Sequence, residues 1–204
     1  MSQQPLSARP SLLDHSFYQR WLTGTLTLDE LRDYACQYAH VVSALPRWLR
    51  LAGASNPDLA DRLEAHAVEE DAHFELWTRF SSALGVTTKE LDATKPNAAT
   101  AALLDLGDDL AVTPTGAAVA WSFEVQAPAV SEEKLRGLRA HYGIEGGSGA
   151  DYFELHSRRD VEHASELEAM MAGYDEAALR DAQQTADAMT QGLWSLLSSV
   201  EHTA

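Results

Sequence analysis

Apolar residues recur every three or four positions along most of the chain, a spacing that places them on one face of an α-helix. The repeat is regular over residues 27–55, 56–85, 150–174 and 176–200. Runs that alternate apolar and polar residues, the mark of a half-buried β-strand, are nearly absent. The pattern therefore predicts an all-α protein.

Residues that favour helix ends set the limits of these segments. Thr27 and Glu30 have the spacing of a capping box, in which each side chain binds a backbone N–H of the other residue. Asn56 before Pro57 is a good N-cap followed by a residue suited to the first turn. Gly85 follows its helical segment, a place where glycine commonly ends a helix.

Two prolines modify the helices that contain them. Pro46 should kink the 27–55 helix, and Pro128 should interrupt a helical segment over 115–143, because a proline ring collides with the preceding turn. Shorter helical segments are predicted at 11–24, 88–94 and 97–112. Together these segments predict a bundle of about seven helices.

Size and composition suit one domain. The chain has 204 residues, 45% of them apolar, which is enough for a real hydrophobic core. We expect a single helical domain over residues 1–204, with residues 1–10 flexible.

Charge and the length of apolar runs restrict the partners and the compartment. The net charge is −16 and no cluster of Lys and Arg offsets it, so a nucleic-acid partner is not expected. No uninterrupted apolar run approaches about 18 residues, so no membrane span is expected. The N-terminus lacks a signal-peptide pattern and Cys36 is the only cysteine, so we expect a cytoplasmic protein.

One stripe of residues has the composition of a metal site. His156, Asp160 and His163 are spaced by four and three residues, so they point about 0°, 40° and −20° around a helix axis. Imidazole and carboxylate are ligand types of transition metals. The alternative is a solvated helix face that happens to contain two histidines.

A second stripe lies in the 56–85 segment. Glu70 and His73 are three residues apart, the Glu-x-x-His spacing of dinuclear sites in helical bundles. Glu69 lies four residues before His73, so either glutamate is a candidate ligand. His66, seven residues before His73, lies on the same face and is a further candidate.

Glu124 is the candidate carboxylate from a third helix. It lies in the apolar sequence "AVAWSFEVQAPAV", and a carboxylate in such surroundings is costly unless it is paired or bound to metal. An ion pair with Arg47 or Arg158 is the alternative. The two stripes and this glutamate together favour a metal site.

Four segments resemble the heme-oxygenase-like diiron oxidases, within the PqqC/TenA-like superfamily. They are "HSFYQRWLTGTLTLDELRDYA", "EEDAHFELWTRFSSALGV", "FEVQAPAVSEEKLRGLRAHYG" and "YFELHSRRDVEHA". Within that group they resemble the CADD-like branch, which is linked to para-aminobenzoate formation. The resemblance covers about residues 14–198 and implies a heme-oxygenase-like bundle and a homodimer.

The resemblance also implies a ligand set. It makes metal ligands of His73, Glu124, His156, Asp160 and His163, with one further carboxylate from the pair Glu69 and Glu70. The gap from this pair to His73 is a few residues shorter than in the branch. We expect Glu70 to be the ligand, because its three-residue spacing keeps it on the His73 face, and Glu69 is the alternative.

Three further residues match positions that the branch uses in its chemistry. The resemblance implies that a tyrosine of the protein supplies the aminobenzoate ring, and Tyr18 matches it. Tyr34 and Lys134 match a second tyrosine and a lysine near the site. The alternatives are core packing for the two tyrosines and a surface position for Lys134, which lies in the polar sequence "SEEK".

The resemblance implies a dioxygen-dependent oxidoreductase that holds two iron ions, or iron and manganese, and uses an external reductant. We expect it to form para-aminobenzoate for folate synthesis from its own Tyr18. Three alternatives stay open: a diiron oxidase acting on a free amino or fatty acid, a metal-free PqqC-like oxidase, and a non-enzymatic interaction protein.

Overall fold

Helices are the only regular secondary structure in the computed structural model, which describes residues 6–7 and 9–202. The α-helices are α1 (Ser16–Thr23), α2 (Leu28–Ser55), α3 (Ala60–Ala83), α4 (Thr88–Ala93), α5 (Ala98–Ala111), α6 (Ala117–Glu124), α7 (Ala127–His141), α8 (Asp151–Met171) and α9 (Glu176–Ser199). Short 3-10 helices are η1 (Leu12–Asp14), η2 (Pro57–Leu59) and η3 (Gly147–Gly149). The predicted all-α class is confirmed.

The helix count differs from the sequence estimate for a local reason. The 115–143 segment divides into α6 and α7, with Pro128 in the first turn of α7. The short α4 corresponds to the helical segment predicted at 88–94. Of the segment 1–10 that we expected to be flexible, residues 1–5 and 8 lie outside the described residues.

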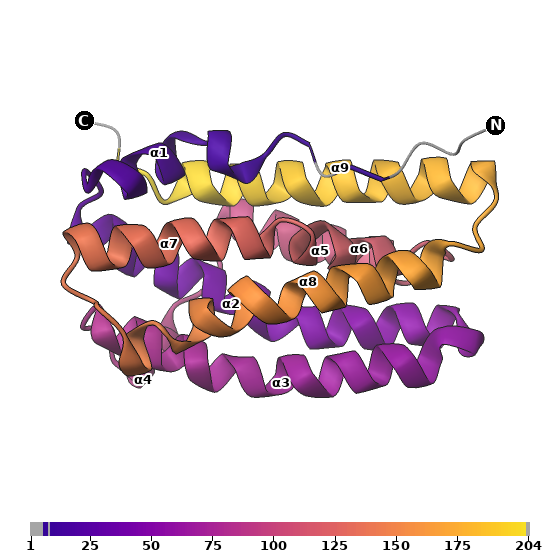
Figure 1. Cartoon of the computed structure of the whole chain (residues 1–204), viewed down its shortest axis with the longest axis horizontal. Helices are drawn as coiled ribbons and strands as arrows, with labels where there is room; N and C mark the ends of the chain where they lie inside the picture. The colour runs from indigo at the N-terminus through magenta and orange to yellow at the C-terminus, as the bar shows by residue number, and fades with distance from the viewer. Residues whose placement is uncertain (1–5, 8, 203–204) are drawn as a thin grey trace.

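The long helices form a bundle around a buried central element (Figure 1). α2 and α3 pack together as a hairpin, α7 packs on α8, and α9 lies along α5 and α6. α6 contacts α2, α8 and α9, and all eight of its residues are buried. No described helix is both long and apolar enough to span a membrane.

The predicted signals at helix ends act as expected with one exception. The capping box of Thr27 and Glu30 forms at the start of α2. The Glu30 carboxylate is also fully buried against Arg20 of α1, at 2.6 Å, which ties the first two helices together. The exception is Asn56, whose side chain donates to the Ala52 carbonyl and does not cap the next helix. The α2 helix continues through Pro46.

A close contact between α1 and α7 sets the position of two residues that matter below. Trp21 of α1 is fully buried, and its indole N–H donates to the backbone carbonyl of Lys134 on α7, at 3.1 Å. Gly137 lies against the same ring, so close that a Cβ atom there would be 2.3 Å from Trp21 Cδ1. Only glycine therefore permits this approach, which holds Tyr18 and Lys134 on neighbouring helices.

Replacing Gly137 by alanine is expected to lower the free energy of unfolding by about 1–3 kcal/mol, because added atoms in a packed core force their neighbours to move. Chemical denaturation measures the change. Gly173→Ala is the matched control, since an added Cβ there meets nothing within 4 Å. Equal stability of the two variants would contradict the close α1–α7 contact.

Candidate dinuclear metal site

Two helices present the same pattern of ligand residues to the centre of the bundle. On α8 the pattern is His156, Asp160 and His163; on α3 it is His66, Glu70 and His73. Both have a histidine, a carboxylate four residues later and a second histidine three residues after that. All six side chains are buried, so neither stripe is a solvated helix face.

The two patterns lie against each other, and their helices run in opposite directions. The His66 ring lies against the His163 ring, with centroids 3.8 Å apart, and the His73 ring lies against the His156 ring at 4.7 Å. Glu124, the last residue of α6, enters the same space, and its Oε1 is 3.2 Å from His66 Nε2. Three helices thus bring imidazoles and carboxylates together.

These side chains divide into two groups that share one glutamate. His66, Glu70, Glu124 and His163 each offer a ligand atom within 4.8 Å of the others, and so do Glu70, His73 and His156. Glu70 Oε1 is 3.8 Å from His66 Nε2 and 3.6 Å from His163 Nδ1. Its other oxygen, Oε2, is 2.9 Å from His73 Nδ1. One oxygen therefore faces each group, the arrangement of a bridging carboxylate.

Unpartnered atoms show that these groups fit metal ions. Glu70 Oε1, Glu124 Oε2, His156 Nε2 and His163 Nδ1 are buried and have no hydrogen-bond partner among the described residues. Such atoms are rare in folded proteins, because a buried lone pair without a partner costs free energy. His163 Nδ1 lies 3.6 Å from both Glu70 Oε1 and Glu124 Oε2. Imidazole and carboxylate suit several first-row divalent cations.

Without a cation, protons compensate the buried charge. Burial, and then the charges of Glu124 and Glu70, raise the pKa of the Asp160 carboxyl far above its ordinary value. Burial alone would lower the pKa of His163, but Glu124 and Glu70 raise it to about 9. Burial lowers the pKa of His156 to about 4, which keeps that ring neutral and able to bind metal. Bound cations would replace these protons.

The structure separates the two candidate glutamates. Glu70 is 2% exposed and lies in both ligand groups. The Glu69 side chain is 44% exposed, and both its oxygens are 2.8 Å from Arg159. Glu69 Oε2 also accepts from His163 Nε2, at 3.2 Å, on the side of the ring that faces away from the ligand group.

Asp160, which the resemblance implies as a ligand, belongs to neither of these two ligand groups. Its two oxygens lie 2.9 and 2.8 Å from His156 Nδ1, and the Nε2 atom of that ring has no hydrogen-bond partner. Carboxylates that hold the far nitrogen of a ligand histidine fix its orientation and tautomer. Asp160 and Glu69 thus stand in equivalent positions behind the two histidines of α8.

The alternative role for Glu124 does not occur. Arg47, one proposed ion-pair partner, pairs with Asp108, and no described arginine lies within ion-pair distance of Glu124. Burial alone would raise the pKa of Glu124, but the nearby His163 and the hydrogen-bonded His66 lower it to about 2. Its position at the negative end of α6 adds to the demand for a cation.

His66, a further candidate from the sequence, lies in one of the two ligand groups. The available signal was the identical spacing of the α3 and α8 patterns, which predicts two equivalent stripes. The spacing alone does not show that the helices run in opposite directions. Only that arrangement places His66 beside His163 and Glu124.

The three predicted catalytic residues form a separate buried cluster. Lys134 Nζ is 2.5 Å from the Tyr34 hydroxyl and 5.5 Å from the centre of the Tyr18 ring. Burial raises the pKa values of both tyrosines and lowers that of Lys134 to about 7. The surface position considered for Lys134 is wrong, since the residue is 3% exposed.

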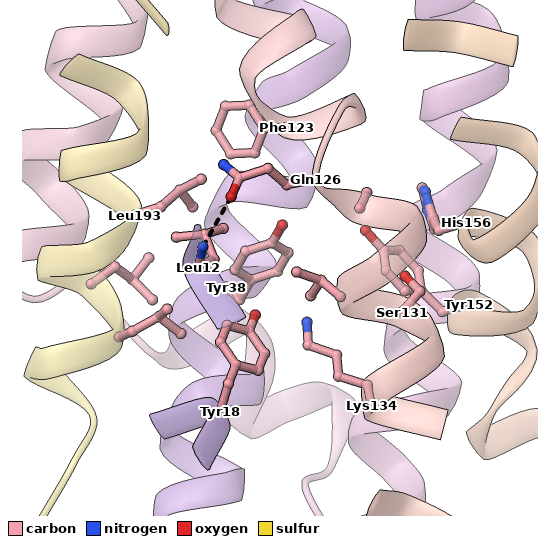
Figure 2. Close-up of a pocket in the computed structure, with 14 residues that line it drawn as sticks. Leu12, Tyr18, Tyr38, Phe123, Gln126, Ser131, Lys134, Tyr152, His156 and Leu193 are labelled. Atoms are coloured by element: carbon pink, nitrogen blue, oxygen red, sulfur yellow. Dashed lines mark hydrogen bonds between the residues drawn. The ribbon is translucent and has the colours of Figure 1, made fainter. Parts of the chain in front are cut away.

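A small cavity connects this cluster with the metal-ligand side (Figure 2). Its volume is about 40 Å³, and Tyr18, Tyr38, Lys134 and His156 are among the residues that line it. A second cavity of about 20 Å³ adjoins it and reaches Glu70, Glu124 and Asp160. The Tyr18–Lys134 side and the ligand groups thus open onto neighbouring spaces.

Comparison with known proteins agrees with this arrangement. Residues 5–195 match the family described as the TENA/THI-4/PQQC family. The chain is 34% identical to a Chlamydia trachomatis protein named "4-aminobenzoate synthase", over 92% of this chain and 85% of that one. A Nitrosomonas europaea protein of the same name is 27% identical, over 93% and 85% of the two chains.

Solved structures share the fold at lower sequence identity. A heme oxygenase-like domain from Shewanella denitrificans superposes with a TM-score of 0.81 at 17% identity, over 93% of this chain and 84% of that one. A CADD-like protein from Nostoc punctiforme gives 0.73, also at 17% identity, over 90% and 86%. The predicted heme-oxygenase-like fold and the resemblance to CADD-like proteins are confirmed.

Glu70→Gln is expected to leave at most one ion per chain, because it removes the carboxylate charge that both ligand groups share. Glu69→Gln should keep about two ions and weaken their binding about 10–100-fold, the usual effect of losing a residue that orients a ligand. Metal analysis after anaerobic loading with Fe(II) and desalting gives the content, and titration gives the affinity. Equal losses of bound metal in the two variants would contradict the separate roles of Glu70 as a shared ligand and Glu69 as an orienting residue.

Proposed function

Because the chain belongs to the TENA/THI-4/PQQC family, we propose that it is a dioxygen-dependent oxidoreductase that forms 4-aminobenzoate (para-aminobenzoate) at a dinuclear metal site, for use in folate synthesis. The observation that carries this proposal is the pair of buried ligand groups that share Glu70, beside a small cavity lined by Tyr18 and Lys134. The relatives named "4-aminobenzoate synthase" support the choice of product.

The ligand groups would hold the two ions. His66, Glu124 and His163 would hold one, His73 and His156 the other, and Glu70 would bridge them. When bound, two ferrous ions, or iron with manganese, would activate dioxygen with electrons from an external reductant. Asp160 and Glu69 orient His156 and His163 from behind.

The size of the cavity supports a substrate supplied by the protein itself. A cavity of about 150 Å³ is needed to take up benzene, whereas the space beside Lys134 is about 40 Å³. A free amino acid or fatty acid would not enter without displacement of the walls. The phenol ring of Tyr18 already forms part of the wall and is 3% exposed.

Lys134 has the properties of a base. No described carboxylate pairs with it, and its neighbours are the rings of Tyr18, Tyr34, Tyr38 and Phe153. A buried lysine without a counter-charge loses its proton readily, and the pKa of about 7 leaves much of the amine neutral at physiological pH. The neutral amine can accept the phenolic proton of Tyr34, to which it is hydrogen-bonded.

The alternatives fit the site less well. A metal-free oxidase would have no use for four buried imidazoles, three of which (His66, His156 and His163) have a nitrogen without a hydrogen-bond partner. An interaction protein would carry its distinctive residues on the surface, whereas these are buried. We expect a cytoplasmic homodimer, and light scattering tests the oligomeric state.

Tyr18→Phe is expected to abolish 4-aminobenzoate formation, because the variant lacks the phenol that becomes the product. Metal-loaded protein, exposed to dioxygen and a reductant, would be assayed by mass spectrometry. The parent, grown on ring-labelled tyrosine, should release at most one labelled product per chain. Tyr142→Phe, a tyrosine outside both cavities, is the control. Product made by Tyr18→Phe, or many turnovers by the parent, would favour the oxidase of a free substrate.

The initial rate of product formation should rise about tenfold between pH 6 and pH 8, since Lys134 with a pKa of about 7 acts as the neutral amine. The protonated form dominates below pH 7 and cannot accept the proton. Lys134→Arg stays charged throughout this range and should give no product. Metal content is measured at each pH, because histidine protonation also releases metal. A flat profile at constant metal content would exclude this role.

A further inference from the structure

The metal-ligand groups and the Tyr34–Lys134 pair lie on different helices. The ligands come from α3, α6 and α8, whereas the pair comes from α2 and α7. The two cavities that join these regions share five wall residues: Tyr38, Phe123, Ala127, Tyr152 and His156. Any transfer of electrons between the regions passes by this common wall.

Tyr38 is the shared wall residue that touches the pair directly. Its ring centre lies 5.4 Å from that of Tyr34 and 5.3 Å from Lys134 Nζ. Figure 2 shows its ring in the middle of the cavity, between Tyr18 and the side chains above. The other shared tyrosine, Tyr152, stacks on His156 at 4.1 Å and reaches Tyr34 only through Trp77.

We infer that Tyr38 is an electron relay between the metal-side cavity and Tyr34. Tyrosine can lose and regain one electron, which phenylalanine, alanine and a metal-bound imidazole do not readily do. The inference rests on the proposed function, because that function supplies dioxygen as the oxidant. It adds a residue to which neither the sequence patterns nor the relatives point.

The transfer balances as two one-electron steps. In the first, Tyr38 gives one electron to dioxygen, and its phenolic proton passes to the reduced oxygen, which leaves a neutral tyrosyl radical at Tyr38. In the second, Tyr34 gives one electron to that radical and its proton to Lys134 Nζ, while Tyr38 regains a proton from water, which leaves as hydroxide. The net result is one oxidised Tyr34, one protonated Lys134, one hydroxide ion, and dioxygen reduced by one electron and one proton.

The surroundings of Tyr38 suit these steps. Burial, and then neighbouring groups that include Tyr18 and Glu124, raise its pKa well above the ordinary value, so the phenol keeps its proton until it is oxidised. The adjoining cavity of about 20 Å³ has room for a water molecule. Nearby negative charge also favours loss of an electron over its gain.

The test is Tyr38→Phe, which removes the phenol and keeps the ring that packs against Trp77 at 5.0 Å. Parent and variant would each be produced with ordinary and with deuterated tyrosine and loaded with metal. Each sample would be mixed with dioxygen and freeze-quenched for electron paramagnetic resonance. We expect the variant to keep its metal content and its unfolding midpoint. It should lose the tyrosyl signal, and the amount of product formed in the first turnover should fall at least tenfold.

Two further variants separate the route from packing effects. Fluorotyrosine at position 38 keeps the ring and the phenol but changes its reduction potential, so it should change the rate of signal formation and leave metal content unchanged. Tyr152→Phe tests the longer route through Trp77 and should retain the Tyr34 signal. Loss of the signal in Tyr152→Phe with retention in Tyr38→Phe would overturn the inference.

The outcomes also separate this inference from the function on which it rests. If Tyr38→Phe makes product at the parental level with an unchanged signal, the relay is wrong and the proposed function stands. If the parent itself binds two metals and makes no product, the proposed function fails, and the relay fails with it.

Discussion

The structure depends on the burial of four imidazoles and three carboxylates at one point between three helices. Each carboxylate taken out of water costs several kcal/mol unless another charge compensates it. Hydrogen bonds to histidines compensate part of this cost, and Glu70 Oε1, Glu124 Oε2 and His163 Nδ1 still have no partner. Cations are the species that satisfy these atoms together. The arrangement of α3, α6 and α8 is therefore a cage of ligand atoms suited to cations.

Sequence spacing predicted much of this cage because the ligands lie on regular helices. His156, Asp160 and His163 share a face through geometry that any helix has, and the apolar flanks of Glu124 indicated its burial. Spacing favoured Glu70 over Glu69 only weakly, since both lie within one turn of His73. Contacts between helices separate the two more clearly: Glu70 lies in both ligand groups, and Arg159 of α8 pairs with Glu69 at the rim.

Lys134 also shows that the local sequence pattern does not determine whether a residue is buried. Its neighbours Glu132 and Glu133 are exposed or half-buried, so the sequence "SEEK" is typical of a surface. The lysine itself points inward, because Trp21 packs so tightly on Gly137 that this face of α7 is covered. The bundle, not the local sequence, buries the amine and lowers its pKa. The place of Tyr38 in the wall of both cavities is likewise set by contacts between helices.

Burial explains both the lowered pKa of Lys134 and the small size of the cavity beside it. The exclusion of water that lowers the pKa of Lys134 to about 7 also leaves a cavity of only about 40 Å³. An enzyme that must admit and release a free substrate needs an open path, and water in such a path would return the lysine toward its ordinary pKa. A protein that uses its own tyrosine avoids this conflict, because the reacting ring is already inside. The cost is that each chain carries only one Tyr18. The small buried cavity and the proposed single-use reaction therefore follow from the same packing.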